Sequence, residues 1–321
     1  KDIKMDMTNL ILTTDSYKVS HWKQYPPGTT KIYSYFESRG GDFQEIVFFG
    51  LQYILKKYLH AWHSWNSDIQ EAESFLAQHF RNKEIFNKSG WERLLSKHSG
   101  YLPILIRAIP EGTIVPSRHA LMTIENTDPE FPWITNYVET LLSQVWYPCT
   151  VATQSREMKK ILLQFLKETG DPALINFKLH DFGERGSTSM ESAGIGGMSH
   201  LVNFKGTDTM VGLVYARDYY YEAMAGFSCP AAEHSTMTIY EEDGEEEAVR
   251  HHLEAFPTGL LAIVGDSYNI YNFIENVIGT KCKELIVNRR GVTIVRPDSG
   301  TPSQVVCDVL RLLGMKFSYT M

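Results

Sequence analysis

The sequence predicts an α/β protein in which a mixed α+β region precedes a parallel sheet or barrel. Two observations support this prediction. After about residue 170, apolar β-prone segments alternate with helical ones, as in parallel sheets. Before that point, helical patterns and short β-prone pieces follow one another without regular alternation. We therefore expect a mixed α+β domain over residues 1–150 and an α/β domain, built on a parallel sheet or barrel, over residues 151–321.

The composition is typical of a globular protein, since 43% of the 321 residues are hydrophobic and 21% are charged. A formal net charge of −7 disfavours a general nucleic-acid binder. The apolar runs are too short to cross a bilayer, and no signal peptide is visible, so we expect no membrane partner. Four cysteines without metal-like spacing indicate free thiols and a cytoplasmic protein.

Four helices and a β-rich stretch are expected in the first part of the chain. Residues 50–62 and 68–80 place apolar side chains at helical spacing. Residues 101–125 form short β-prone pieces punctuated by proline and glycine. Two further helices are expected over 133–146 and 150–169, separated by a break near Pro148.

Three strands are expected in the second part, and each runs directly into a polar motif. The strands cover 176–180, 260–264 and 292–295, and the motifs that follow are HDFGERG, GDSYN and RPDSG. Because the carboxyl ends of parallel strands meet at one edge, these polar side chains are expected to lie together. The residues concerned are Asp181, Arg185, Asp266, Arg296 and Asp298. Internal ion pairs that close a barrel rim are the alternative interpretation.

His234 is a further candidate because it stands in SCPAAEHST, after a glutamate and before two hydroxyl residues. A lone histidine is more often a packed or hydrogen-bonded residue than a catalyst. An imidazole oriented by a carboxylate can act as a base, or as a nucleophile towards a phosphoryl group. The residues alone leave these alternatives open.

Several long motifs, in order along almost the whole chain, resemble the nicotinamide phosphoribosyltransferase family. Residues 13–41 read TTDSYKVSHWKQYPPGTTKIYSYFESRGG. The later motifs are KLHDFGERG (178–186), HLVNFKGTDT (200–209), PAAEHST (230–236), GDSYNIYN (265–272) and VRPDSG (295–300). The resemblance implies a type II phosphoribosyltransferase fold, which is an irregular α/β barrel with an accessory α+β domain.

The resemblance also implies a reaction, co-substrates and an assembly. Nicotinamide and phosphoribosyl pyrophosphate would give nicotinamide mononucleotide and pyrophosphate. Mg²⁺ would accompany the pyrophosphate, held largely by substrate oxygens, so no residue is assigned as a metal ligand. ATP would be hydrolysed as a co-substrate. Members of the family are homodimers whose active sites are shared between subunits.

Three residues would recognise the pyridine ring if the resemblance holds. Phe182 would stack on one face, and Tyr17 of the partner subunit would cover the other. Asp208 would accept a hydrogen bond from the amide nitrogen, and its negative charge would disfavour nicotinate. The alternative for Asp208 is an N-cap on the helix that begins near Met210.

The basic residues would hold the phosphorylated substrate. Arg185 and Arg296 match family positions near the ring and the phosphoribosyl group. Arg39 of the partner subunit matches a residue that contacts the pyrophosphate region.

Three further residues would act in catalysis. His234 matches the family histidine that is phosphorylated during ATP hydrolysis, and Asp266 would orient it. Asp298 would lie below the ribose and favour the developing positive charge.

The chain departs from the family pattern at its end, because it stops at KFSYTM where the family continues. The family's GDG turn and its glycine-rich phosphate loop are not in the sequence. We expect the barrel to lack its C-terminal strands, and residues 1–321 alone to show little or no transferase activity. A fragment, a natural truncation and a split enzyme remain open. Two other functions also remain open: an inactive relative that binds a ring ligand or dimerises, and a nicotinate phosphoribosyltransferase.

Overall fold

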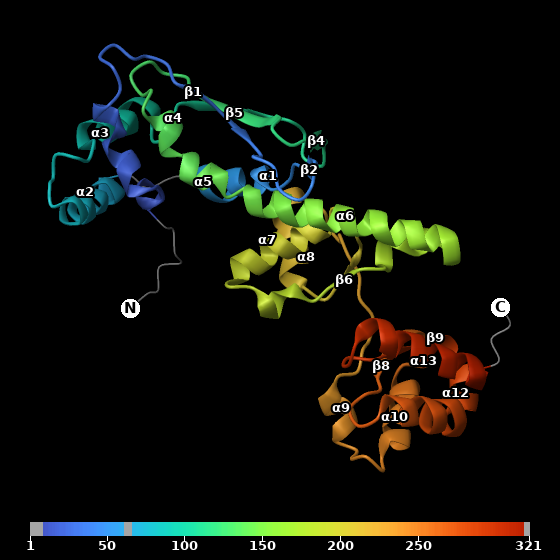
Figure 1. Cartoon of the computed structure of the whole chain (residues 1–321). Coiled ribbons are helices and arrows are strands. Elements are labelled where there is room, and N and C mark those ends of the chain that lie inside the picture. Colours follow the sequence, from blue (N-terminus) through green and yellow to red (C-terminus); the bar gives the residue numbers. More distant parts are fainter. Residues whose placement is uncertain (1–8, 61–65, 318–321) are drawn as a thin grey trace. The chain divides into compact units, whose positions relative to one another are not determined.

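The structure, a computed structural model, describes residues 9–60 and 66–317. The chain divides into two compact units, residues 1–227 and 228–321. The first unit is coloured from blue to yellow in Figure 1, and the second from orange to red. The boundary that the sequence predicted at 150/151 falls inside α6 (Trp146–Thr169), which is one continuous helix of 24 residues. The division by contacts therefore differs from the predicted domains.

Antiparallel sheets occupy the first half of the first unit. A three-stranded sheet has the order β1-β5-β3, and β2 pairs with β4. The β-prone pieces expected over 101–125 are confirmed as three of these strands. The bounds are β1 (Tyr33–Glu37), β2 (Glu45–Val47), β3 (Ile104–Ala108), β4 (Ile114–Pro116) and β5 (Ala120–Asn126).

The helix expected over 68–80 is confirmed as α2 (Asn66–Phe80), which buries Ile69, Ala72 and Leu76 at helical spacing. The helix expected over 50–62 is confirmed to residue 59 as α1 and the π-helical segment η3, and 61–62 lie outside the described residues. Other elements of this part are η1 (Leu10–Leu12), η2 (Ser16–Lys23), α1 (Leu51–Ile54), η3 (Leu55–Leu59) and α3 (Lys88–His98).

The helix break expected near Pro148 falls a few residues earlier, at residues 144–145, where a turn precedes α6. Pro148 lies in the first turn of α6, where a missing N–H removes no intrahelical hydrogen bond. The helix expected over 133–146 is itself divided into α4 (Ile134–Tyr137) and α5 (Glu139–Ser143).

The strand expected over 176–180 is largely wrong. Pro172–Phe177 form the 3₁₀ helix η4, because the Asp171 side chain accepts from the Ala173 N–H and Pro172 fixes the first turn. Only His180 remains in a strand, β6, which pairs in parallel with β7. The elements that follow η4 are β6 (His180–Asp181), η5 (Gly183–Gly186), α7 (Met190–His200), β7 (Gly206–Thr207) and α8 (Met210–Tyr220).

The second unit is built on the parallel pair of β8 (Thr258–Val264) and β9 (Arg290–Arg296). The strands expected over 260–264 and 292–295 are therefore confirmed. The last four residues of β8 are all buried, as in a strand covered on both faces. The helical elements are α9 (His234–Thr238), α10 (Glu245–Ala255), α11 (Ile270–Asn272), η6 (Phe273–Lys281), α12 (Lys283–Asn288) and α13 (Pro302–Phe317).

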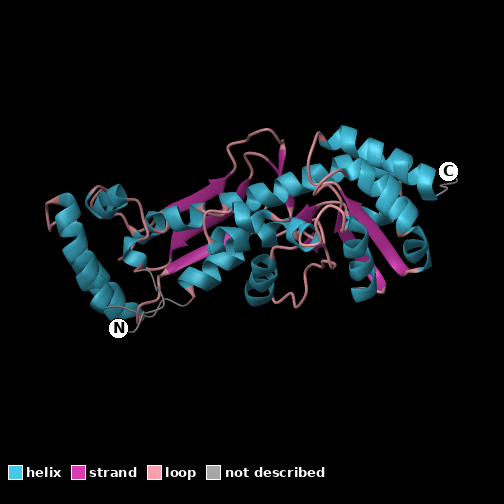
Figure 2. Ribbon diagram, turned by 90° about the horizontal axis from the view of Figure 1, so that it is seen from below, coloured by secondary structure: helices cyan, strands magenta, loops and turns pink. Residues whose placement is uncertain are grey.

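The α/β fold class is confirmed, with more helix than strand in both units (Figure 2). Within residues 9–60 and 66–317, the parallel pairs β6–β7 and β8–β9 stand as separate two-stranded sheets and form no closed barrel. None of the helices in these ranges is long and apolar enough to span a membrane.

Helices α7 and α8 come into backbone contact through two glycines. A methyl group added at Gly212 would lie 2.8 Å from the carbonyl carbon of Gly197. One added at Gly197 would lie 2.9 Å from Cγ2 of Thr209. No real Cβ approaches backbone this closely, so this packing requires glycine at Gly212. The contact holds together the two helices that follow β6 and β7.

We expect Gly212→Ala to destabilise the protein by about 1–3 kcal/mol, because the added methyl must push α7 and α8 apart. Urea unfolding followed by circular dichroism measures the change. The matched control is Gly314→Ala in α13, where an added Cβ meets no atom within 4 Å. The control is expected to be neutral or slightly stabilising, since alanine favours a helix. Equal unfolding midpoints for the two variants would show that the helices adjust freely.

Candidate functional site

Three side chains lie close together where β6 and β7 end. Phe182 and Asp208 are predicted site residues, and His180 is their neighbour. The parallel register pairs His180 with Gly206, and the Asp208 N–H donates to the Asp181 carbonyl at 2.8 Å. His180 Nε2 lies 3.0 Å from Asp208 Oδ1, and the His180 ring lies 5.0 Å from the Phe182 ring. We call His180, Phe182 and Asp208 the β6–β7 cluster.

The β6–β7 cluster is accessible to a ligand. The Phe182 side chain is 49% exposed, and the Asp208 carboxylate is about one third exposed. Arg185 is also exposed, in η5. The N-cap position of α8 is Thr209, so the alternative role of Asp208 as that cap is wrong.

Asp181 has a different role from Asp208. Its Oδ1 accepts from the Gly183 N–H at 3.0 Å, which shapes the turn that carries Phe182. A cavity of about 500 Å³ borders this turn, lined by residues that include His180, Asp181, Gly183 and the buried His200. Burial lowers the pKa of His200, so its imidazole is neutral near pH 7.

Tyr17 and Arg39 lie on other parts of the first unit. Tyr17 is 58% exposed in η2, and its ring meets the edge of His21 at 4.9 Å. Arg39 is exposed in the loop after β1, before Gly40. The Tyr17 ring contacts His21 and the Lys18 ammonium group, which are both in η2. Their action from a partner subunit stays a prediction.

A second group of polar residues lies where β8 and β9 end, in the second unit. The register pairs Val264 with Arg296, so residues just beyond both strands lie at the same edge. His234, which opens α9, has Nδ1 3.0 Å from Ser267 Oγ and Nε2 3.2 Å from Asp298 Oδ2. We call His234, Asp266, Arg296 and Asp298 the β8–β9 cluster.

The carboxylate that hydrogen bonds His234 is Asp298, and not Asp266 as the sequence suggested. Asp266 Oδ2 instead accepts from the Asp298 N–H at 2.9 Å and from Ser299 Oγ at 2.6 Å. Partial burial acts to raise the pKa of Asp266, but these hydrogen bonds and the nearby His234 hold it below its ordinary value. Asp266 thus stays ionised and anchors the loop that presents Asp298 to His234.

Two buried polar atoms in the β8–β9 cluster are available to bind a ligand. Arg296 Nε and Asp266 Oδ1 are buried and have no hydrogen-bond partner in the part of the chain that the structure describes. A buried guanidinium N–H fits an anionic oxygen, and a buried carboxylate oxygen fits a donor or a cation. The described residues contain no group of three or more His, Cys, Asp or Glu that could hold a metal ion.

Sequence reasoning missed His180, Ser267 and Ser299 as parts of these clusters. Each directly adjoins a residue or motif that had been singled out: HDFG, GDSYN and RPDSG. The signal was available, because histidine and hydroxyl side chains in such motifs are the usual partners of carboxylates. What the sequence could not give is which atom each one meets.

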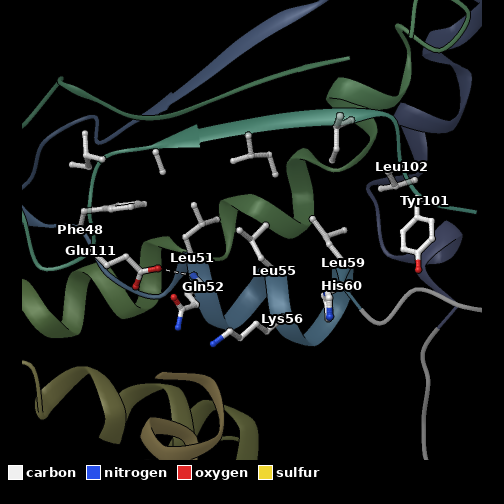
Figure 3. A pocket seen from close by; sticks show the side chains of 14 residues that line it. Phe48, Leu51, Gln52, Leu55, Lys56, Leu59, His60, Tyr101, Leu102 and Glu111 are labelled. Atoms are coloured by element: carbon white, nitrogen blue, oxygen red, sulfur yellow. Dashed lines mark hydrogen bonds between the residues drawn. The ribbon is translucent and has the colours of Figure 1, made fainter. Parts of the chain in front are cut away.

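Another cavity, of about 560 Å³, contains none of the predicted site residues (Figure 3). Apolar side chains of α1, η3 and β3 line most of it. The Glu111 carboxylate at its edge accepts from the Gly50 N–H at 2.7 Å and the Gln52 N–H at 2.6 Å. Glu111 therefore caps the first turn of α1 by accepting from two of its backbone N–H groups.

Two family models match the chain. Residues 9–106 match "Nicotinamide phosphoribosyltransferase, N-terminal domain", and residues 177–320 match the "Nicotinate phosphoribosyltransferase (NAPRTase) family". A protein of Xanthomonas campestris pv. campestris named nicotinamide phosphoribosyltransferase is 47% identical, over 98% of this chain and 67% of its own length. Proteins of the same name from Acinetobacter baylyi and Mycoplasma genitalium are 35% and 31% identical, over 93% and 96% of this chain and 63% and 70% of their own lengths.

Solved structures share the fold at low identity. Human nicotinic acid phosphoribosyltransferase matches with a TM-score of 0.63 and 18% identity, over 95% of this chain and 65% of that one. Nicotinate-nucleotide pyrophosphorylase from Pyrococcus furiosus matches with a TM-score of 0.57 and 14% identity, over 99% of this chain and 66% of that one. The chain spans about two thirds of the length of the relatives it matches.

Proposed function

The chain belongs to the nicotinamide phosphoribosyltransferase family, and from this premise we propose that the protein transfers the phosphoribosyl group of phosphoribosyl pyrophosphate to nicotinamide. The products are nicotinamide mononucleotide and pyrophosphate, in a salvage step of NAD synthesis. The observation that carries the proposal is the β6–β7 cluster, where the exposed Phe182 ring and the Asp208 carboxylate flank one histidine. A flat aromatic amide needs such a stacking surface and such an acceptor.

Asp208 favours the amide over the acid. Its carboxylate can accept an N–H from a carboxamide, whereas it would repel the carboxylate of nicotinate across a short distance. Nicotinate is nevertheless the second candidate, because the family model matched to residues 177–320 is named for that substrate. The choice of ring therefore rests on Asp208.

The proposed transfer forms a bond between the ring nitrogen and C1′ of the ribose and breaks the bond from C1′ to pyrophosphate. The ring nitrogen attacks C1′ of the ribose with its lone pair, and the C1′–O bond to pyrophosphate breaks, so the electron pair leaves with pyrophosphate. No proton needs to move. Positive charge develops on the ribose, and the exposed Asp298 carboxylate is proposed to stabilise it.

The arginines are proposed to hold the phosphorylated substrate. Arg296 fits an anion because its Nε is buried and has no partner among the described residues. Arg185 and, from a partner subunit, Arg39 would add charge near the ring and the pyrophosphate.

Mg²⁺, when bound with the substrate, would neutralise part of the pyrophosphate charge. Asp266 and Asp298 fit this ion, because carboxylate oxygens are its preferred protein ligands and Asp266 Oδ1 has no partner in the described ranges.

ATP is proposed as a co-substrate that phosphorylates His234. A nitrogen of the imidazole would attack the γ-phosphorus, the bond from that phosphorus to ADP would break, and water would later hydrolyse the N–P bond. Asp298 and Ser267 would orient the ring, since each is hydrogen bonded to one of its nitrogens. Such a cycle would couple ATP cleavage to substrate binding.

A homodimer is proposed to complete the site, with Tyr17 of the partner subunit covering the second face of the ring. The Tyr17 ring is 58% exposed and is therefore accessible for such a contact. We further propose a cytoplasmic location, where buried thiols such as Cys149 and Cys282 remain reduced.

The proposed activity is tested on the purified protein at its full natural length, with nicotinamide, phosphoribosyl pyrophosphate and Mg²⁺. Chromatography should detect nicotinamide mononucleotide. Asp298→Asn serves as the control for contaminating enzymes, and its rate is expected to fall by about 10²–10³ because a preorganised charge is lost. A well-folded preparation that forms no product above the enzyme-free blank would refute the proposal.

Asp208→Ser should lower kcat/KM for nicotinamide by an amount equivalent to about 1.5–3 kcal/mol, because a hydrogen bond to a charged group is lost. Nicotinate should become relatively better, since the repulsion disappears. Steady-state kinetics with both rings measures the change. Asp218→Ser is the matched control, because Asp218 pairs with Arg217 on α8 and lies outside the cluster. A wild-type protein that already prefers nicotinate would contradict the role given to Asp208.

His234→Ala should abolish ATP hydrolysis coupled to turnover and leave a slow, uncoupled transferase, because the histidine need not touch C1′. The ratio of ADP to mononucleotide formed measures the coupling. His251→Ala, on the exposed side of α10, is the control. Unchanged coupling in the His234 variant would reject the phosphohistidine.

A further inference from the structure

His180 stands at the centre of the β6–β7 cluster, and the proposed reaction so far gives it no role. Its Nε2 lies 3.0 Å from Asp208 Oδ1, and both side chains are 32% exposed. An ionised carboxylate can only accept, so Nε2 carries the hydrogen and donates it to Oδ1. In this pair, His180 is therefore the hydrogen-bond donor and Asp208 is the acceptor.

The backbone fixes both members of this pair. The register of β6 and β7 places His180 opposite Gly206, two residues before Asp208. The Asp208 N–H donates to the Asp181 carbonyl at 2.8 Å, which continues the ladder beyond β7. The terminal torsion of an aspartate is broad and is not fixed by its own rotamer preference. The hydrogen bond from His180 is therefore one contact that holds the rotation of the carboxylate.

The imidazole is itself held in place. A Cβ added at Gly206 would lie 2.7 Å from His180 Nδ1, so the ring occupies the space that a side chain at Gly206 would need. On another side, the Phe182 ring lies 5.0 Å away with an interplanar angle of 38°. His180 therefore contacts two of the residues that the proposed function gives to the pyridine ring, Asp208 and Phe182.

We propose that His180 is a positioning residue that sets the ring selectivity of the enzyme, by aiming the Asp208 carboxylate at the carboxamide of the ligand. This inference rests on the proposed function and deepens it. Loss of His180 leaves the negative charge of Asp208 in the site but removes its fixed direction. Binding of nicotinamide should weaken while nicotinate gains nothing, which differs from the effect of losing Asp208 itself.

The test compares His180→Phe, which keeps a ring without a donor, with His180→Gln, which keeps a donor at a similar reach. In the protein at its full natural length, His180→Phe should raise KM for nicotinamide roughly ten-fold, because a charge-assisted hydrogen bond is lost. The kcat should change much less, and nicotinate kinetics should not improve. His180→Gln should recover most of the affinity. His119→Phe, an exposed histidine next to Ala120, is the control.

Two further variants distinguish the positioning of Asp208 by His180 from a general loss of structure. His180→Phe combined with Asp208→Ser should be no worse than Asp208→Ser alone, since His180 acts through Asp208. Gly206→Ala, which displaces the imidazole, should raise KM in the same direction as His180→Phe. The melting temperature of every variant is measured. The KM of His180→Gln is compared with that of His180→Phe only if the two variants have the same melting temperature.

Three results would overturn the inference while leaving the proposed function intact: an unchanged KM in His180→Phe, a glutamine variant no better than phenylalanine, or effects that multiply in the double variant. If the wild type forms no mononucleotide, the proposed function fails separately. Calorimetric titration with nicotinamide then decides the inference, and equal or absent binding in wild type and His180→Phe would overturn it.

Discussion

The parallel pairing of short strands is the constraint on which both candidate sites depend. In a parallel pair the two carboxyl ends lie at the same edge, so residues just beyond them become neighbours whatever their distance along the chain. His180 meets Asp208 across 28 residues in this way, and Asp298 meets Asp266 across 32. The two-residue pair β6–β7 needs further support, which the close contact of Gly197 with Gly212 supplies.

The aspartates at the carboxyl ends of the two strand pairs make the same two kinds of contact. Asp181 and Asp266 each accept a backbone N–H from the loop beside them, and so give that loop its shape. Asp208 and Asp298 each pair with a histidine, at 3.0 and 3.2 Å. At each pair of strand ends, one carboxylate therefore shapes a loop and the other is hydrogen bonded to a histidine. The lowered pKa of Asp266 follows from this arrangement, because its hydrogen bonds favour the ionised form over the effect of burial.

The exposure of polar and aromatic side chains distinguishes the two candidate sites from the cavity beside α1. Phe182, Asp208, His234 and Asp298 are each between about one third and one half exposed, as groups that receive ligands must be. The cavity beside α1 is larger and mostly apolar, yet its nearest carboxylate, Glu111, is committed to the N–H groups of a helix end. We place the candidate sites at the strand ends because exposed ionisable and aromatic groups gather there, and none of them lines the larger cavity.

The sequence by itself determined the strongly periodic elements and the family. Helix α2 and strands β8 and β9 follow from local spacing and composition, because a helix face or a buried strand is encoded within a few consecutive residues. The tertiary structure alone decided that Pro148 lies in the first turn of a helix, that residues 172–177 form a 3₁₀ helix rather than a strand, and that Asp298 rather than Asp266 hydrogen bonds His234. The last of these joins residues 64 positions apart, and only the register of distant strands determines which side-chain atoms face each other.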